Sequence, residues 1–305
     1  MTGVLNAFGT IGVIIGAGFL LAHLRIVDVS VQRALGKVVF WVAAPALLVG
    51  VVGDSDLADI VSVGALAQLL AVVIGMALVA VPARLVWGHG LVGTTVASSL
   101  VGFVNALNLG LPLAILALGD ASAIVPMVLI QLLFVQPLMI AVLERSRPGT
   151  GGGPVRAAAR TLVQPLLLGT ALGVVLSATG WDLPTVLATP LEMIGSMTIP
   201  AILIGFGVSL RLGPSIGAGR WREVAWITVV KLVAMPAVAV GVALALGLDR
   251  SATLAVAVVS ALPSAQNVFV IAGEYGRGED LARDGIVVTT LLSFPAIVGI
   301  AAILG

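Results

Sequence analysis

The chain has 305 residues, of which 60% are hydrophobic and only 10% are charged, and its mean hydropathy is +1.20. A soluble domain of ordinary composition carries about 25% charged residues, so this composition excludes one and indicates a polytopic membrane protein. The formal net charge of +1 argues against a nucleic-acid partner, and the absence of cysteine excludes disulfides and thiolate metal sites. We expect a lipid bilayer around the chain, no cofactor and no metal.

Apolar runs long enough to cross a bilayer follow one another along the chain. We predict ten transmembrane helices, and so an all-α membrane protein, with spans at residues 3–22, 35–53, 60–81, 91–118, 122–142, 162–180, 186–210, 223–246, 251–273 and 284–304. If successive loops alternate sides, every loop lysine and arginine except Arg250 falls on one side. Because cytoplasmic loops carry the excess of positive charge, this predicts a multi-pass protein of the cell membrane with both termini extracytoplasmic.

The chain divides at a glycine-rich linker, residues 144–160, which contains PGTGGGP. It lacks the Gly-Lys-Ser/Thr ending of a phosphate loop, so we interpret it as a flexible cytoplasmic tether. Five spans lie in residues 1–143 and five in residues 161–305, and PALLVG at Pro45 matches PAILIG at Pro200, 155 positions later. Since an odd number of spans turns the second half upside down, we predict two inverted five-helix repeats.

Two of the predicted spans carry polar and helix-breaking residues near the middle of the membrane. In the ninth, Pro263 has no N–H and crowds the carbonyl four residues earlier, so we expect the helix to break there. Ser264, Gln266 and Asn267 follow directly. In the fourth, residues 105–112 read NALNLGLP. Helix breaks at this depth are the usual sequence sign of a transporter binding site, because freed backbone groups cannot face lipid.

An offset of 159 positions aligns residues 103–108 with residues 262–267. Inverted symmetry would bring the two breaks together as a crossed pair, where the second half of the ninth span offers N-terminal N–H groups to an anion. If the fourth span is helical, its two asparagines share one face. We predict one central substrate site containing Asn105, Asn108, Gly110, Pro112, Pro263, Ser264, Gln266 and Asn267. For each polar side chain, hydrogen bonding to the freed backbone is an equal alternative.

Lys231 is the one cation predicted deep inside a span, away from its ends, and lies eight residues after Glu223. A charge inside the membrane is costly, so we include Lys231 in the predicted site, as a partner for a substrate carboxylate or a coupling proton. It lies roughly 12 Å from the inner end of its helix, and snorkelling of its side chain is an equal alternative. Weaker candidates are Gln131, Gln136, Thr289, Thr290 and Ser293, and Glu192 is predicted to be interfacial.

The sequences ALPSAQNVFVIAGEYG, from residue 261, and NALNLGLP resemble the ninth-span and fourth-span motifs of the auxin efflux carrier family, whose bacterial members include malate and other organic-acid permeases. The resemblance implies an elevator-type carrier, in which a transport subdomain with crossed fourth and ninth helices moves against a scaffold subdomain. It also implies small carboxylate substrates and gives site roles to Asn105, Gln266 and Asn267.

This chain departs from the family at one position of the first motif. The plant auxin exporters have a proline before the fourth-span asparagine, where this chain has Val104. We therefore expect the first break to depend on Gly110 and Pro112 instead.

Together these features predict a secondary active transporter or uniporter of small organic anions, such as malate or auxin-like carboxylates, and not an enzyme. A sodium-coupled bile-acid-type symporter and an anion channel are the alternatives. The breaks lack the acidic residues usual in the sodium-coupled carriers, so H+ coupling or uniport is favoured over Na+ coupling. The oligomeric state stays open, a homodimer included.

Overall fold

The computed structural model describes residues 2–54, 62–115, 122–145, 164–212, 220–274 and 278–305. These residues are mostly helical, and the one β-type contact among them is an isolated antiparallel bridge between Val104 and Ser264. Six of the described helices are long and apolar enough to cross a membrane: Val29–Gly53, Val63–Leu85, Val125–Leu143, Thr185–Leu212, Trp221–Ala245 and Glu279–Leu304. Four shorter apolar helices accompany them: Gly9–His23, Leu91–Gly102, Pro165–Thr179 and Arg250–Ser260.

Large apolar side chains face outward from these helices. Val13, Leu85, Val186 and Ile303 are 74–82% exposed. An outward apolar surface is stable against lipid chains and not against water. The all-helical membrane protein predicted from the composition is therefore confirmed.

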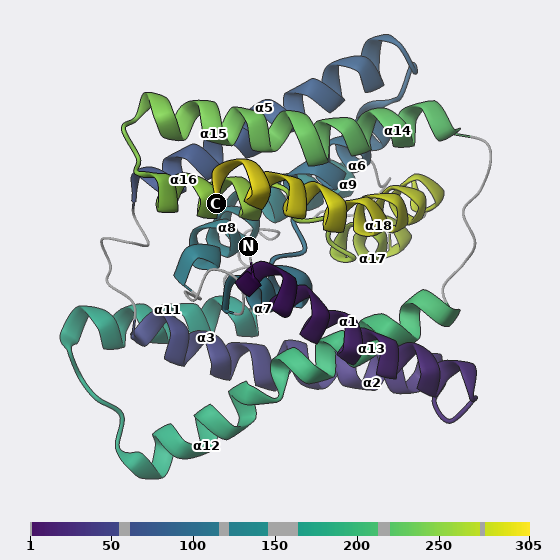
Figure 1. Ribbon diagram of the computed structural model, residues 1–305. Helices are drawn as coiled ribbons and strands as arrows, with labels where there is room; N and C mark the ends of the chain where they lie inside the picture. The colour runs from purple at the N-terminus through teal and green to yellow at the C-terminus, as the bar shows by residue number, and fades with distance from the viewer. Residues whose placement is uncertain (1, 55–61, 116–121, 146–163, 213–219, 275–277) are drawn as a thin grey trace.

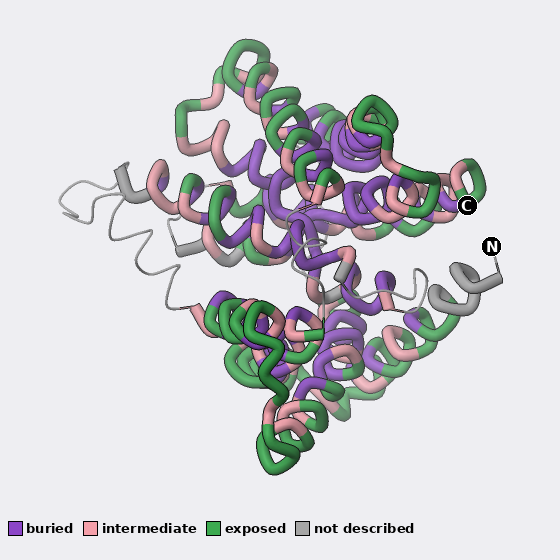
Figure 2. The backbone as a smooth tube through the Cα atoms, turned by 90° about the vertical axis from the view of Figure 1, so that its left-hand side faces the viewer, coloured by how far each residue is buried: buried purple, intermediate pink, exposed green. Residues whose placement is uncertain are grey.

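The helices form two layers, one above the other in Figure 1 and visible again from the side in Figure 2. Layer A, the lower one in Figure 1, contains α1 (Thr2–His23), α2 (Val29–Val38), η1 (Val39–Ala43), α3 (Ala44–Gly53), α11 (Pro165–Thr179), α12 (Thr185–Ser196) and α13 (Thr198–Leu212). Layer B contains α5 (Val63–Leu85), α6 (Leu91–Gly102), η4 (Ser122–Ile124), α8 (Val125–Ile130), η5 (Gln131–Val135), α9 (Gln136–Arg145), α14 (Trp221–Val229), η7 (Val230–Ala234), α15 (Met235–Ala245), α16 (Arg250–Ser260), α17 (Asn267–Glu274) and α18 (Glu279–Leu304).

Helices α1 and α13 of layer A pack backbone against backbone. A Cβ atom added to Gly207 of α13 would collide with backbone atoms of Ile15 and Phe19, and one added to Gly18 would collide with the backbone of Ile204. Helices in a membrane associate through close van der Waals packing, which small residues permit. The two glycines therefore set the distance between α1 and α13.

Helices α3 and α11 pack in the same way on the other side of layer A. A Cβ on Gly169 of α11 would lie 2.6 Å from the carbonyl oxygen of Pro45, and one on Gly173 would lie 2.7 Å from Cβ of Val52. These glycines are four residues apart and lie on one face of α11. Layer A is thus held by two glycine-dependent helix pairs.

Four π-helical turns each end two residues before a proline. The turns are η1, η2 (Ala106–Gly110), η5 and η7, and the prolines are Pro45, Pro112, Pro137 and Pro236. A proline has no N–H and crowds the carbonyl four residues earlier, which in each case belongs to the middle residue of the π-turn. The wider turn accommodates the ring, so the helix continues through the proline.

The part of the fourth span that follows its break lies between the two layers. Leu107 of η2 packs against a small cluster of layer A, formed by Val39, Ala44, Ala201 and Ile202. The following segment, α7 (Leu111–Leu113), contacts α1. The layers therefore meet at the residues that follow the first helix break, and also where Val52 of α3 packs against Val125 of α8.

The second predicted span starts earlier than expected, and the predicted linker is largely undescribed. The second span begins at Val29 and not at residue 35, because Asp28 caps α2 by accepting hydrogen bonds from the N–H groups of Ser30 (2.8 Å) and Val31 (3.2 Å). Hydrogen bonds from the Ser30 hydroxyl and from these N–H groups lower the pKa of Asp28. Most of the predicted linker, residues 144–160, lies outside the described residues.

Candidate functional site

Two interrupted helices of layer B meet at their breaks. Helix α6 ends at Gly102 and helix α16 ends at Ser260. We call residues 103–105 and 261–266, which follow these ends, the crossing. The second of the two breaks is at the place predicted from Pro263.

Backbone groups of the crossing bond to one another. The N–H of Asn105 donates to the carbonyl of Pro263 (2.8 Å), and the N–H of Ala265 donates to the carbonyl of Phe103 (2.9 Å). A backbone group freed by a helix break must find a partner when no water is present. Each break therefore supplies partners for the other, and the antiparallel bridge described above is the result.

The first break lies earlier than predicted. Phe103 has extended backbone angles (φ −90°, ψ 109°), whereas Gly110 is helical (φ −65°, ψ −48°). The expectation that Gly110 and Pro112 make this break was wrong. The π-turn η2 accommodates Pro112, and the non-helical residues from Phe103 to Asn105 gain hydrogen bonds from the other break.

Gly110 and Pro112 affect the shape of this region and add no polar side chain to it. Both are buried, and a Cβ on Gly110 would lie 2.6 Å from Cδ1 of Leu262 and 2.8 Å from Cδ1 of Ile124. The absence of a side chain at Gly110 lets η2 approach the segment around Leu262. Pro112 belongs to the short helix α7.

Ser264 is fully buried, and its hydroxyl and its N–H are both hydrogen-bonded. Its hydroxyl donates to the carbonyl of Leu100, and its N–H donates to the hydroxyl of Thr289 (3.2 Å). That hydroxyl in turn donates to the carbonyl of Gly285 (2.7 Å). Ser264 therefore ties α16 and α6 to α18, the backbone-bonding role that the sequence left as an alternative.

Asn105 is buried, and one of its polar atoms is unsatisfied. Its carbonyl accepts from the N–H of Gly110 (3.0 Å), but its side-chain Nδ2 has no hydrogen-bond partner among the described residues. A buried unsatisfied donor is uncommon, and a ligand can complete it. The backbone angles of Asn105 (φ −72°, ψ 60°) are not helical, so it does not share a helix face with Asn108, whose side chain lies outside the described residues.

The second half of the ninth span, helix α17, begins at an accessible position directly after the crossing. Pro263 is buried, Gln266 is half-buried and Asn267, the first residue of α17, is exposed. Among the described residues no acceptor is bonded to the N–H groups of Gln266 or Asn267. Free N–H groups give this helix end a partial positive charge that favours an anion.

Lys231 lies in the π-turn η7, and its side chain reaches the residue just before the crossing. Its side chain is fully buried, so it does not snorkel to the surface. Nζ donates to the carbonyl of Ser260 (2.7 Å), the last residue of α16, and lies 3.2 Å from the sulfur of Met235. Lys231 is thus joined to the crossing through the end of a helix.

Two polar side chains next to the breaks were not singled out from the sequence. The hydroxyls of Ser99 and Ser260 are buried without a hydrogen-bond partner among the described residues. Nε2 of Gln131 and the hydroxyl of Thr290, two of the weaker candidates, are in the same condition. The one sequence signal for the two serines is that each lies in the last turn before a break.

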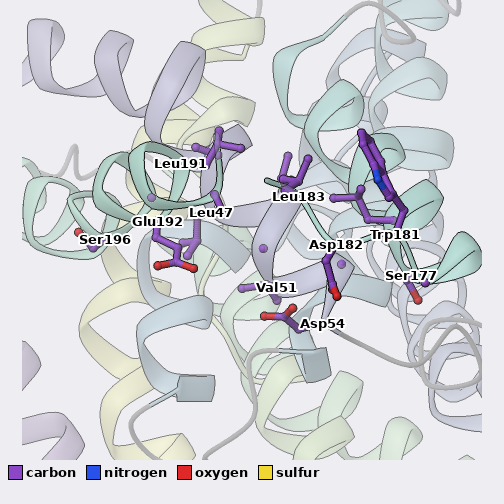
Figure 3. A pocket seen from close by; sticks show the side chains of 18 of the residues that line it. Leu47, Val51, Asp54, Ser177, Trp181, Asp182, Leu183, Leu191, Glu192 and Ser196 are labelled. Carbon is purple, nitrogen blue, oxygen red and sulfur yellow. The ribbon is translucent and has the colours of Figure 1, made fainter. Parts of the chain in front are cut away.

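A cavity of about 970 Å³ lies elsewhere, between α3, α11 and α12 of layer A. Figure 3 shows Asp54, Asp182 and Glu192 among the residues that line it. Carboxylates repel an anionic substrate, and none of the predicted site residues lines this cavity. Glu192 is exposed, in keeping with the interfacial position predicted for it.

The sequence is similar to known transport proteins. Residues 156–301 match the family described as membrane transport protein. Over 219 residues the chain is 31% identical to a protein of Rhizobium meliloti (strain 1021) that carries the provisional name malonate transporter, and the alignment covers 68% of this chain and 67% of that protein. The chain is therefore a member of the membrane transport protein family, which includes the auxin efflux carriers that its motifs resemble.

Proposed function

We propose that the chain is a secondary carrier or uniporter of small organic anions, which bind at the crossing. One observation carries this proposal: backbone hydrogen bonds join the two breaks, and one break holds the unsatisfied amide of buried Asn105 while the other leads into the accessible N-terminal end of α17. Helix N-termini and amide donors bind carboxylates without a fixed countercharge. The name of the Rhizobium relative favours a short dicarboxylate such as malonate, and malate has similar chemistry.

We further propose ten transmembrane helices in two inverted five-helix repeats, residues 1–143 and 161–305. The glycine-dependent helix pairs of layer A support this arrangement. An offset of 155 relates Gly18 to Gly173 and Val52 to Gly207, and the contact between Gly18 and Gly207 has its counterpart in the contact between Gly173 and Val52.

The crossing supports the same repeat. An offset of 159 relates Val104 to Pro263 and Asn105 to Ser264. Two pairs of residues are in contact: Val104 with Ser264, and Asn105 with Pro263. If each residue is replaced by its partner in the other repeat, the first pair becomes the second. A contact pattern that maps onto itself is expected for two copies related by a two-fold axis in the membrane plane.

An elevator movement fits the two layers. We propose that layer A is the scaffold and that layer B carries the crossing and its substrate across the membrane. The contact of Leu107 with the small apolar cluster of layer A, and the contact of Val52 in layer A with Val125 in layer B, join apolar side chains, past which one layer can slide. Small sliding movements of packed elements are a common form of domain motion.

For the orientation, we propose a cell-membrane protein with its basic ends in the cytoplasm and both termini outside. Arg211 donates to Nδ1 of His23 (3.3 Å), so the end of α13 lies beside the end of α1. Arg250 donates to the carbonyls of Leu304 and Gly305 (2.7 Å each), which places the C-terminus beside the start of α16. A homodimer is a further expectation, tested by the mass of the purified complex.

Neither segment of the crossing contains an acidic residue. We therefore propose H+ coupling or uniport, and not the Na+ symport of bile-acid-type carriers. An imposed pH gradient in the assay below tests this choice.

The test is uptake of radiolabelled malonate into proteoliposomes, with malate, succinate, citrate and indole acetate as competitors. We expect saturable uptake by the wild type and a loss of about tenfold or more in the Asn105→Ala plus Asn267→Ala variant, because hydrogen bonds to a charged group are each worth about 1.5–3 kcal/mol. Gln32→Ala, which removes an amide from α2 in layer A, is the matched control and keeps wild-type uptake.

Three results would contradict the proposal in different ways. A wild type that moves none of these acids removes the organic-anion assignment. Flux that does not saturate favours the anion channel. A double variant as active as Gln32→Ala shows that the two amides only form hydrogen bonds with backbone groups and that the substrate site lies elsewhere.

A further inference from the structure

Lys231 has no carboxylate partner among the described residues. The structure gives it no ion pair with any described acidic residue, and its side chain is fully buried. The acidic residue on its own helix, Glu223, pairs instead with Nε2 of His89 (2.8 Å). An unpaired ammonium in a dry site costs several kcal/mol, so dipoles must offset that cost.

The dipole that faces Lys231 is the end of α16. Near the end of α16, the backbone carbonyls as far as Val259 accept hydrogen bonds from backbone N–H groups. The last of these is the bond from the N–H of Leu262 to the carbonyl of Val259 (3.3 Å). The carbonyl of Ser260 accepts from Nζ of Lys231 instead (2.7 Å). Because a helix carries a negative partial charge at its C-terminal end, a cation is favoured there.

Ser260 has a second oxygen at this helix end, its side-chain hydroxyl. The hydroxyl of Ser260 is buried and has no hydrogen-bond partner among the described residues. Unwound carbonyls and the C-terminal ends of half-helices coordinate the coupling ion in Na+-driven carriers. In this chain the amino group of Lys231, a residue of the π-turn η7, lies at such a helix end.

We propose that the Lys231 ammonium is a built-in monovalent cation that takes the place of a bound Na+ at the end of α16. Lys231 is then a positioning residue: it holds the half-helix in place and makes the carrier independent of Na+. The consequence for transport rests on the proposed function, whereas the cation site is a property of the fold. Removal of the ammonium leaves the two oxygens of Ser260 available to a small external cation.

The experiment compares wild type, Lys231→Ala and the control Lys37→Ala, which removes an exposed lysine of α2. The Tm of each purified protein is measured in NaCl and in choline chloride at equal ionic strength. We expect wild type and Lys37→Ala to have the same Tm in both salts. Lys231→Ala has a lower Tm in choline chloride and gains stability saturably with Na+, since a ligand that binds only the folded state raises Tm. Uptake of malonate by Lys231→Ala falls at least tenfold in choline chloride and recovers in NaCl.

If Lys231 has only a structural role, the Tm and the malonate uptake of Lys231→Ala do not respond to Na+. A folded Lys231→Ala protein whose Tm and uptake ignore Na+ overturns the proposal, and so does a wild type that needs Na+. Lys231→Gln, which keeps a neutral donor, replaces Lys231→Ala if the latter does not fold, and the wild-type comparison needs no variant. If wild type transports no malonate, the proposed function fails while the Tm comparison still decides this inference.

Discussion

Gly207→Val is expected to prevent α1 and α13 from packing and so to abolish the folded protein. The new Cβ would collide with the backbone of Ile15 and Phe19, and a backbone cannot move aside as the end of a side chain can. Overpacking a core ordinarily costs about 1–3 kcal/mol, and a collision with backbone should exceed that range. Size-exclusion chromatography of the detergent-solubilised protein measures the loss as a smaller monodisperse fraction.

Gly205→Val is the matched control on the same helix, because a Cβ at Gly205 meets no heavy atom within 4 Å. It makes the same chemical change two residues away and should leave the monodisperse fraction unchanged. Equal behaviour of the two variants would show that α1 and α13 do not approach as closely as the structure has them. A failure of Gly207→Val alone identifies the helix pair as essential to layer A.

Composition and proline chemistry predicted much of the fold. The strong apolar bias predicted a multi-pass helical protein, and the ring of Pro263 predicted where the ninth span leaves its helix. These features are local, because they depend on hydropathy along the chain and on one residue's missing N–H. The family resemblance was local as well, since it rested on two short motifs.

The position of the first break could not be predicted in this way. Nothing about Val104 itself ends a helix, and the residues around it leave the helical conformation because the second break supplies their hydrogen bonds. Pro112 misled the prediction for a related reason: a π-turn can accommodate a proline that would otherwise break a helix. Both outcomes depend on tertiary structure.

The hydrogen-bond partners of single side chains could not be predicted from the sequence either. For Lys231 the sequence offered a substrate contact or snorkelling, and the structure shows a third arrangement, a bond to the end of α16. For Ser264 it offered a site role or a backbone role, and the structure shows its hydroxyl and its N–H both bonded. Only the packing of α16 against its neighbours decides between such alternatives.

Thr289→Val is expected to loosen the crossing. Valine has nearly the shape of threonine but cannot accept the hydrogen bond from the N–H of Ser264 (3.2 Å). That N–H is buried, so it would be left unsatisfied at a cost of about 1–3 kcal/mol. Because α18 then no longer holds the second break in position, we also expect malonate uptake to fall.

The neighbouring residue provides the control. The Thr290 hydroxyl has no hydrogen-bond partner among the described residues, so Thr290→Val removes a buried polar atom without breaking a bond and should leave Tm unchanged or raise it. The measurement is Tm in detergent for the two valine variants and the wild type. A lower Tm for Thr289→Val alone means that the bond to Ser264 stabilises the crossing. Equal Tm values for the two variants would mean that backbone pairing between the breaks suffices, and that α18 is free to move relative to them during transport.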